Sequence, residues 1–399
     1  MTRFVVVGIG ADGWAGLSGH ARTQLRSATE IVGSARQLAL LPADLGAATT
    51  PWRSPMSEHL QEVLAGESDA PEQTVHVLAS GDPMLHGIGS TIVKAVGADR
   101  VTVLPAPSSI SLAAARLGWD LAHTRVLSLV TAEPEALIGA VTDGARLLVL
   151  SRDGHSPGRV ADLLRCTGFE RSEMTVLGDL GGPGETIASG TARTWRDEPS
   201  PVLNVLAIDC VGPATSRAPG LADAEFAHDG QLTKQAVRAV TVAALAPAEG
   251  QLLWDVGAGS GSVGIEWLRQ TATGRVIAFE ADPERADRIT ANARRHGVAD
   301  RLSVAGAVPD ALSGAPGPDT VFVGGGLDGE VLEICREAIA GGGRLVANAV
   351  TLETEQLLVA AHAEGGGTLT RLQFDYASAL GSKTAWRPAL PVVQWVVTR

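Results

Sequence analysis

Aromatic residues make up only 4% of this 399-residue chain, which argues against a stacking platform for single-stranded nucleic acid. Basic residues are also few: 32 Lys and Arg stand against 44 Asp and Glu, and the net charge of −12 disfavours a nucleic-acid or anionic-membrane surface. No apolar run is long enough for a transmembrane helix, and the apolar start of the chain runs into Asp12, too early for a secretory signal. Cys166, Cys210 and Cys335 form no CxxC, and none of the nine His residues has metal-ligand spacing. We therefore predict a cytoplasmic, reduced, metal-free protein that binds neither nucleic acid nor membrane.

A stretch rich in Pro, Gly, Ala and Ser divides the chain. It reads VGPATSRAPGLADAEF, follows the strand-like NVLAIDC, and has no apolar periodicity. Its position predicts a linker over 213–225 between a domain of residues 1–212 and a domain of residues 226–399. The length is sufficient for two hydrophobic cores.

Both halves alternate short apolar runs with amphipathic helical patterns, so we predict an α/β chain. In the first half the runs indicate a buried, largely parallel sheet, with strands at 4–10, 74–80, 100–106, 125–130 and 146–151. In the second half a helix over 233–245 places Ala236, Val237, Val240 and Ala244 on one stripe. Strands then alternate with helices, and ligands of such folds bind at the carboxyl ends of the strands.

The strongest motif is the glycine loop Asp255-Val-Gly257-Ala-Gly259-Ser-Gly261, which follows a predicted strand and opens a predicted helix. Its glycines let backbone N–H groups approach a ligand. The run from Gly259 to Gly264 also satisfies the dinucleotide pattern, so an NAD-dependent dehydrogenase stays open. Asp255 would repel a pyrophosphate but can hold a methionyl ammonium through the backbone or water, which favours S-adenosylmethionine. Glu280 ends the next strand, at the position that hydrogen-bonds the ribose hydroxyls of either cofactor.

Three loops of the first half also stand at strand ends. They are Val7-Gly8-Ile9-Gly10, SGDPMLHG at 80–87 and PAPSSIS at 105–111. Each is a common turn by itself. Together they predict a ligand cleft.

These segments carry a family resemblance. VVGIGADGWAGLS, IVGSARQLALL, ASGDPMLHGIGS and APSSISLAAARLGW resemble the tetrapyrrole (corrin/porphyrin) methylase family. LTKQAVRAVTVAAL, WDVGAGSGSVGIEW, FVGGG and GGRLVANAVTLET resemble the precorrin methyltransferase-decarboxylase subunit. In this order, fused, they resemble the bifunctional precorrin-6Y methyltransferase (decarboxylating) family of cobalamin biosynthesis. The resemblance implies a tetrapyrrole-methylase fold of two α/β subdomains with a cleft, followed by a Rossmann-like S-adenosylmethionine-dependent methyltransferase fold.

The resemblance also implies the chemistry. An anionic precorrin is methylated at ring carbons 5 and 15 and loses the carboxyl of the carbon-12 acetate, which converts precorrin-6B to precorrin-8X. The family assigns carbon 15 and the decarboxylation to the second half. Two S-adenosylmethionine sites are implied, with contacts at Gly10, Ala11, Asp82, Leu85, Ser109 and Ile110, and at Thr233, Gly257, Ala258, Gly259, Ser260, Gly261, Glu280 and Val308. We expect a homo-oligomer.

Two positions depart from the family pattern. Relatives usually carry an acid in the loop GAVPDAL, where this chain has Ala307, so adenine recognition there rests on backbone groups. Relatives of the first half often read SLHGR where this chain reads SLVTAEP, from Ser128 to Pro134. The functions of that His and Arg are therefore missing here.

The acetate and propionate groups of a precorrin require cations in the clefts. The candidates in the second half are Lys234, Arg238, Lys383 and Arg387. His86 and His123 are candidate proton acceptors, and no catalytic residue is assigned. Two other functions stay open: a generic methyltransferase for RNA or a small molecule with a degenerate first half, and a ligand-sensing module without turnover.

Overall fold

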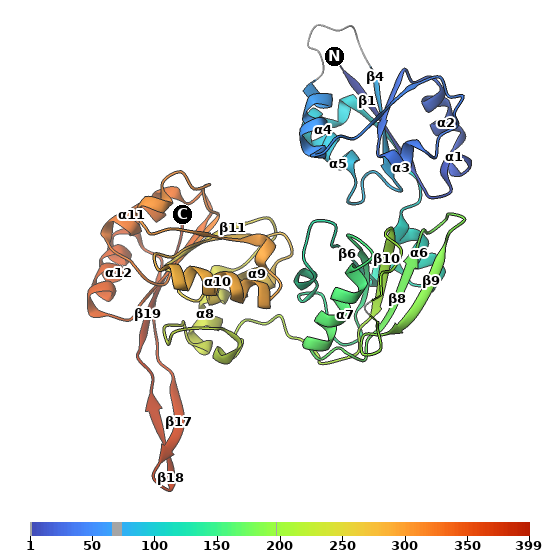
Figure 1. Cartoon of the computed structure of the whole chain (residues 1–399). Helices are drawn as coiled ribbons and strands as arrows, with labels where there is room; N and C mark the ends of the chain where they lie inside the picture. Colours follow the sequence, from blue (N-terminus) through green and yellow to red (C-terminus); the bar gives the residue numbers. More distant parts are fainter. Residues whose placement is uncertain (1, 66–73, 197) are drawn as a thin grey trace. The chain divides into compact units, whose positions relative to one another are not determined.

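The computed structural model of the chain describes residues 2–65, 74–196 and 198–399 (Figure 1). These residues divide into two compact units. One contains the residues up to Pro134 together with Ala140–Ala214, and the other contains Glu135–Gly139 and Thr215–Arg399. The main break, after Ala214, falls inside the segment whose composition suggested a linker. The described residues include no helix with the length and apolar character of a membrane span.

A five-stranded parallel sheet forms the first lobe of the first unit, in the order β3-β2-β4-β1-β5. Its strands are β1 (Arg3–Ile9), β2 (Glu30–Gly33), β3 (Ala48–Pro51), β4 (Thr74–Ser80) and β5 (Val101–Leu104). The helices of this lobe are α1 (Gly13–Gly16), α2 (Gly19–Arg26), α3 (Ala35–Leu38), α4 (Met56–Ala65) and α5 (Ile88–Val96). β1 is buried at every residue but the first, since apolar clusters cover both faces of the sheet. The carboxyl ends of all five strands lie at one edge, where ligands bind in such sheets.

The sheet of the second lobe is mixed, in the order β6-β7-β10-β8-β9. Its strands are β6 (Arg125–Ser128), β7 (Arg146–Leu150), β8 (Glu173–Gly178), β9 (Thr186–Thr191) and β10 (Asn204–Asp209). Helices α6 (Ser109–Leu117) and α7 (Ser156–Cys166) belong to this lobe. Only β6 and β7 are paired in parallel. The expectation of a largely parallel sheet is therefore wrong for this lobe. Residues 179–185, which join β8 to β9, are too few for the crossover that parallel neighbours need, so these strands pair antiparallel.

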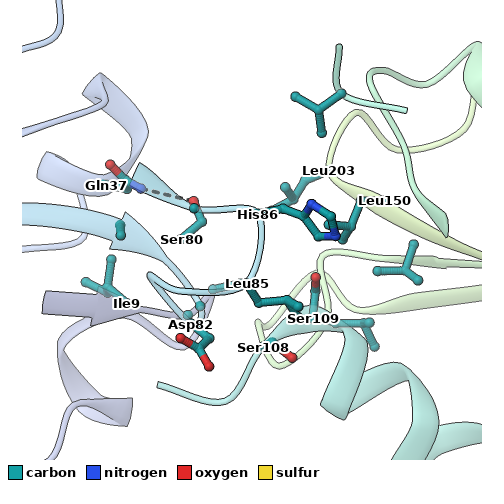
Figure 2. Close-up of a pocket in the computed structure, with 18 of the residues that line it drawn as sticks. Ile9, Gln37, Ser80, Asp82, Leu85, His86, Ser108, Ser109, Leu150 and Leu203 are labelled. Atoms are coloured by element: carbon teal, nitrogen blue, oxygen red, sulfur yellow. Dashed lines mark hydrogen bonds between the residues drawn. The ribbon is translucent and has the colours of Figure 1, made fainter. Parts of the chain in front are cut away.

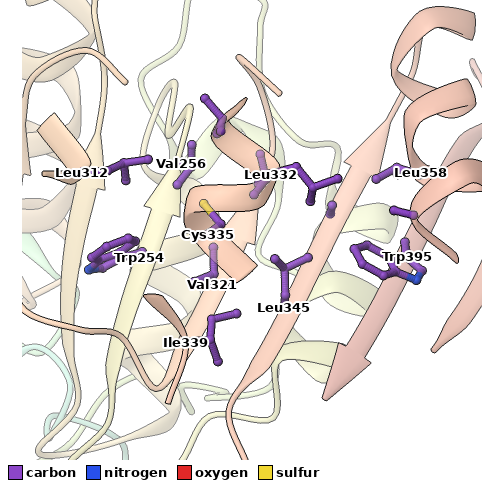
Figure 3. Close-up of a cluster of buried hydrophobic side chains, with 14 of the residues drawn as sticks. Trp254, Val256, Leu312, Val321, Leu332, Cys335, Ile339, Leu345, Leu358 and Trp395 are labelled. Atoms are coloured by element: carbon purple, nitrogen blue, oxygen red, sulfur yellow. The ribbon is translucent and has the colours of Figure 1, made fainter. Parts of the chain in front are cut away.

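The second unit contains a seven-stranded sheet in the order β13-β12-β11-β14-β15-β19-β16. The strands are β11 (Leu252–Val256), β12 (Arg275–Phe279), β13 (Leu302–Ala305), β14 (Thr320–Val323), β15 (Arg344–Ala349), β16 (Thr368–Leu372) and β19 (Val392–Thr398). The helices are α8 (Gln235–Leu245), α9 (Ser262–Gln270), α10 (Pro283–Arg295), α11 (Gly329–Ala338) and α12 (Leu352–Gly365). One of the unit's two apolar clusters contains Trp254 and Trp395 (Figure 3). Each unit thus has its own core, and the predicted α/β class is confirmed.

The strand order of this sheet bears on the dehydrogenase alternative. The dinucleotide-binding fold has six strands in the order 3-2-1-4-5-6. Here the first five strands follow that order, but antiparallel β19 lies next to β15 and separates it from β16. The order reverses at β11, which lies between β12 and β14. The glycine loop after β11 therefore stands at the switch point of the sheet, in a topology that differs from the dinucleotide fold.

Helix α8 buries a different face from the one predicted. Val240 is 37% exposed, whereas Val237, Arg238, Thr241 and Val242 are buried. The buried stripe is rotated toward Arg238 because this side chain finds a buried carboxylate partner, which apolar periodicity cannot reveal. The predicted stripe is wrong at Val240, whereas its Val237 is buried and its Ala244 packs against an apolar cluster of this unit.

Candidate functional site

The loops after β1, β4 and β5 meet at the carboxyl edge of the first sheet. The Gly81 N–H donates to the Ile9 carbonyl at 3.0 Å, and the Ala106 N–H donates to the Gly81 carbonyl at 3.4 Å. A Cβ atom on Gly8 would lie 2.1 Å from the Gly81 carbonyl oxygen, so this close approach requires glycine. The three strand-end motifs are thus joined through their backbones.

A cavity of about 390 Å³ opens at this edge, between the two lobes of the first unit (Figure 2). Its lining includes the predicted contacts Gly10, Ala11, Asp82, Leu85 and Ser109. Ile110 is not part of the lining: its side chain is 2% exposed and packs in the core of the second lobe. Helix α6 turns this residue inward directly after Ser109, so only its backbone can face a ligand.

The second lobe contributes an apolar wall and two polar atoms that sequence reasoning missed. The apolar residues are Leu112, Leu150, Leu177, Leu180, Leu203 and Val205. Asn204 is 7% exposed; its Nδ2 donates to the Pro201 carbonyl at 2.8 Å, while its Oδ1 has no partner among the described residues. The buried Ser151 Oγ, on the neighbouring strand end, also has none. Unpaired buried acceptors are costly, so both atoms suit a ligand that donates N–H or O–H groups. No sequence pattern indicated them, since Asn204 reads as the first residue of a strand.

A hydrogen-bond network fixes the first-lobe side of the cavity. Ser34 and Gln37 form a capping box at the start of α3, and Gln37 is 6% exposed. The Gln37 Nε2 donates to the Ser80 Oγ at 3.0 Å (Figure 2). The Arg36 Nη2 donates to the same oxygen at 2.8 Å. These residues lie in the segment IVGSARQLALL, which carried part of the family resemblance without an assigned role.

The two candidate proton acceptors have different locations. His86 lines the cavity and has a positive φ of 53°, a strained conformation for a residue other than glycine. His123 is exposed, and its Nδ1 lies 2.8 Å from an oxygen of Asp120 outside the cavity lining. Only His86 is therefore placed to meet a ligand there.

The departure between Ser128 and Pro134 changes the cavity itself. β6 ends at Ser128, and Val130, at the position where the family resemblance implies a His, lines the cavity. This part of the wall is therefore apolar and holds no titratable group at position 130.

In the second unit, three glycines of the loop after β11 have positive φ angles. At Gly257 a Cβ atom would lie 2.4 Å from the Gly325 carbonyl oxygen, and at Gly261 it would meet a side chain of α10. At Gly259, with φ +60°, the nearest atom is the Gln231 carbonyl oxygen at 3.9 Å. Gly257 and Gly261 therefore permit packing, whereas Gly259 faces open space, where a ligand can approach the backbone.

Glu280 holds this loop in place. Its Oε2 accepts the Gly259 N–H at 2.8 Å, and its Oε1 accepts the Asp282 N–H at 3.1 Å. Each carboxylate oxygen keeps a further lone pair, so the predicted ribose contact is compatible with this geometry. Ala258 packs against an apolar cluster, and Ser260 is 4% exposed, with a hydroxyl that lacks a partner among the described residues.

Asp255 lies beneath the loop with a 1% exposed side chain. Its Oδ2 accepts the Gly264 N–H at 3.0 Å, and its Oδ1 has no partner among the described residues. Burial raises the pKa of this carboxyl to about 7; the Gly264 N–H opposes the shift, and the charge of Glu280 adds to it. A cationic group near Oδ1 would relieve this desolvation.

Two further predicted contacts lie on neighbouring loops. Thr233 is half-buried, and its carbonyl accepts a bond from Arg238. Val308 packs against the apolar cluster of the sheet, and Ala307 is exposed. Position 307 thus offers only backbone groups for recognition.

The structure does not bring the four predicted cations together. Arg238 has a fully buried side chain that pairs with Glu266, so it is a core residue and not a substrate contact. Lys234 is exposed and lies 3.8 Å from Asp223. Lys383 and Arg387 lie on a hairpin of β17 (Asp375–Leu380) and β18 (Lys383–Pro388), an arm that extends from the sheet (Figure 1). Within the described residues, no group of three or more His, Cys, Asp or Glu side chains could hold a metal ion.

Comparison with known proteins decides the family. Residues 3–195 match the Tetrapyrrole (Corrin/Porphyrin) Methylases, and residues 224–399 match the Precorrin methyltransferase domain. The precorrin-6Y C(5,15)-methyltransferase [decarboxylating] of Mycobacterium tuberculosis is 47% identical over 400 residues, which cover 99% of each chain. The chain belongs to this family.

The chain is also similar to other proteins with related names. The Sinorhizobium protein of the same name is 42% identical over 399 residues, or 99% of this chain and 96% of that one. A shorter relative, the probable cobalt-precorrin-6B C(15)-methyltransferase (decarboxylating) of Pyrobaculum calidifontis, is 38% identical over 154 residues, or 37% of this chain and 78% of that one. The crystal structure of the C-terminal domain of the Rhodobacter capsulatus family member is covered completely by 46% of this chain, at 44% identity and a TM-score of 0.45.

We expect the stability of the second unit to depend on pH through Asp255, and we expect the substitution Asp255→Asn to remove this dependence. The folded pKa of about 7 lies above the ordinary value of 3.8, so the folded state binds the proton more tightly. The free energy of unfolding therefore falls as pH rises from about 4 to 7, by on the order of 4 kcal/mol. Asn keeps an oxygen for the Gly264 N–H but does not titrate.

Denaturant unfolding of the ligand-free chain at about pH 5 and about pH 8, followed by tryptophan fluorescence, measures this difference. Trp254, Trp267 and Trp395 are buried in the second unit and report on it. Asp328→Asn, at the N-cap of α11, is the matched control, since Asn caps a helix as well as Asp does. Equal pH dependence in the native chain and in Asp255→Asn would contradict the expectation.

Proposed function

We propose that the two units of this chain divide the methylations of one precorrin between two separate S-adenosylmethionine sites. As a member of its family, the chain performs precorrin-6Y C5,15-methylation with decarboxylation in cobalamin biosynthesis. The observation that supports this division of the methylations is that each unit has, at the carboxyl edge of its sheet, a place that a ligand can reach. One is the cavity at the end of β1, β4 and β5, and the other is the glycine loop after β11. We also propose that the chain acts as a cytoplasmic homo-oligomer.

The second unit is assigned methylation of carbon 15 and decarboxylation of the carbon-12 acetate. The match of residues 224–399 to the Precorrin methyltransferase domain supports this assignment. The shorter Pyrobaculum relative also supports it, since its name gives C(15) methylation and decarboxylation without C(5) methylation. The first unit is then assigned carbon 5.

Both edges fit S-adenosylmethionine. In the first unit, the unpaired Asn204 Oδ1 and Ser151 Oγ can accept bonds from amino or hydroxyl groups. In the second unit, the open side of Gly259 admits the ligand to the backbone, and Glu280 is placed for ribose hydroxyls. The unpaired Asp255 Oδ1 suits a methionyl ammonium, directly or through water.

The residues of the chain act chiefly by positioning the bound cofactor and precorrin and by excluding water from them. S-adenosylmethionine supplies an electrophilic methyl group when bound. The leucine wall of the first cavity holds an apolar macrocycle face and excludes water, so alignment supplies much of the rate. His86 lines the first unit's cavity and would accept the ring proton after methyl transfer. In the second unit, exclusion of water from the bound acetate group would favour its loss as carbon dioxide.

The test is mass spectrometry of the product formed from precorrin-6B and isotopically labelled S-adenosylmethionine, together with calorimetry of cofactor binding. We expect two labelled methyl groups gained, one carbon dioxide lost, and two equivalents of cofactor bound per chain. A single equivalent bound would refute the two-site proposal. Binding without turnover would instead identify a ligand-sensing module.

A further inference from the structure

One permanent positive charge lines the first unit's cavity. Arg36 is the only Lys or Arg among the described lining residues, and Asp82 is the only Asp or Glu. One of the Asp82 carboxylate oxygens, Oδ1, accepts the Met84 N–H at 2.9 Å. Arg36 forms no ion pair with a described carboxylate, although the chain carries an excess of acidic residues. An exposed guanidinium at a cavity in such a chain is available to a ligand anion.

The position of this guanidinium is defined by its neighbours. Arg36 lies on α3, between the capping-box residue Ser34 and the buried Gln37. Its Nη2 donates to the Ser80 Oγ at 2.8 Å, and the Gln37 Nε2 donates to the same oxygen at 3.0 Å. Only one of the five guanidinium N–H groups is used, and the Ser80 hydroxyl keeps its own hydrogen to donate. A planar cation and a hydroxyl donor therefore stand side by side, an arrangement that matches the two oxygens of a carboxylate.

We propose that Arg36, supported by Ser80 and Gln37, binds an acetate or propionate carboxylate of the precorrin during methylation by the first unit. The inference rests on the proposed function of that unit and names a substrate contact within it. The apolar wall opposite, formed by residues such as Leu150, Leu180 and Leu203, would meet the macrocycle face while Arg36 fixes its rotation in the plane. Arg36 is thus a specificity-determining residue that contacts the substrate, and it takes no part in the bonds that form or break.

The test compares Arg36→Met, which removes the charge, with Arg36→Lys, which keeps the charge but lacks the planar fork. Arg3→Met is the matched control, because Arg3 is exposed at the opposite end of β1 from the cavity. We expect Arg36→Met to raise the KM for the precorrin in carbon-5 methylation about 10- to 100-fold, with kcat and cofactor affinity little changed, and Arg36→Lys to be intermediate. Methylation of carbon 15 and decarboxylation, measured in the same reaction, should not change.

A binding experiment separates this inference from the proposed function. Uroporphyrin, which carries acetate and propionate groups, is titrated against the whole chain, and quenching of tryptophan fluorescence reports binding near Trp52 in the cavity lining. Weaker quenching in Arg36→Met than in Arg3→Met supports the carboxylate contact whatever reaction the unit performs. Equal affinities together with an unchanged KM would refute it. A loss of cofactor affinity in place of precorrin affinity would also refute it, since Arg36 would then hold the cofactor's carboxylate. If Arg36→Met slowed carbon-15 methylation instead, the division of chemistry between the units would fail, while the contact would stand.

Discussion

A chain carrying Gly259→Val is expected to lose carbon-15 methylation and decarboxylation together, while it still methylates carbon 5 of an already decarboxylated substrate. The Cβ side of Gly259 is open, so the valine side chain would occupy the space through which a ligand reaches the loop backbone. The φ of +60° adds local strain of about 1–2 kcal/mol, which the fold can tolerate at a strand-end loop. We expect loss of the second unit's activity by at least about 100-fold.

The control for this strain is Gly342→Val. Gly342 has a φ of +86° with no atom within 4 Å of an added Cβ, and it precedes β15, at the opposite edge of the sheet from the glycine loop. Gly342→Val should lower the melting temperature as Gly259→Val does but keep both methylations. If both variants lose carbon-15 methylation equally, strain and not cofactor exclusion is responsible.

Asp82→Leu is expected to give the opposite product, decarboxylated and one methyl group short. The carboxylate lines the first unit's cavity and also holds the turn by accepting the Met84 N–H. Asp82→Asn keeps an acceptor for that bond, so it separates the loss of charge from the loss of the turn. The product masses of Gly259→Val and Asp82→Leu test which unit performs which reaction. If Gly259→Val gave a decarboxylated product and Asp82→Leu gave none, the roles of the two units would have to be exchanged.

The parts of these sites that the sequence predicted are formed by residues that are close together in the chain. The loops around Gly8 and Gly257 depend on backbone geometry that only glycine permits, so the motif itself carries the information. The strands that were predicted lie within about two residues of the observed ones, because periodicity is also a local signal, but short strands such as β2, β3 and β9 were not predicted. Asn204 and Arg36 carry no such signal. They lie on β10 and α3, and only the folded chain brings both to the lining of one cavity.

The prediction of Arg238 as a cleft cation failed for the same reason: its partners are distant in the sequence. Arg238 in an acidic chain suggested a cleft cation, yet its guanidinium is fully buried and bonded to Glu266, 28 residues further along the chain. Such a pair is costly to bury unless every donor and acceptor is satisfied. Apart from the Thr233 carbonyl, the remaining hydrogen-bond partners come from Gly220, Leu221 and Asp223, inside the segment predicted to be a linker. A composition typical of a linker therefore concealed residues that belong to the second unit's core.

This packing predicts where the chain can be divided. We propose that residues 215–399 fold independently, and we expect a fragment of residues 226–399, which begins where composition placed the domain, to be severely destabilised. The shorter fragment lacks the N–H groups of Gly220 and Leu221 that Glu266 accepts, and the Asp223 carboxylate that lies 3.2 Å from Arg238. Each buried donor or acceptor left without its partner costs about 1–3 kcal/mol, so the loss of several is a large share of the roughly 5–15 kcal/mol that holds a domain folded.

Thermal and denaturant unfolding of the two purified fragments measures the difference. Both lack residues 135–139 of the second unit, so that loss cancels in the comparison. The decisive variant is 226–399 with Arg238→Met and Glu266→Leu, which replaces the buried pair with apolar side chains of similar size. Because it no longer needs the missing partners, it should recover part of the lost stability, whereas the same double substitution in 215–399 should be close to neutral. Should 226–399 prove as stable as 215–399, the contacts of Gly220, Leu221 and Asp223 contribute nothing to the fold, and the domain begins where its composition suggested.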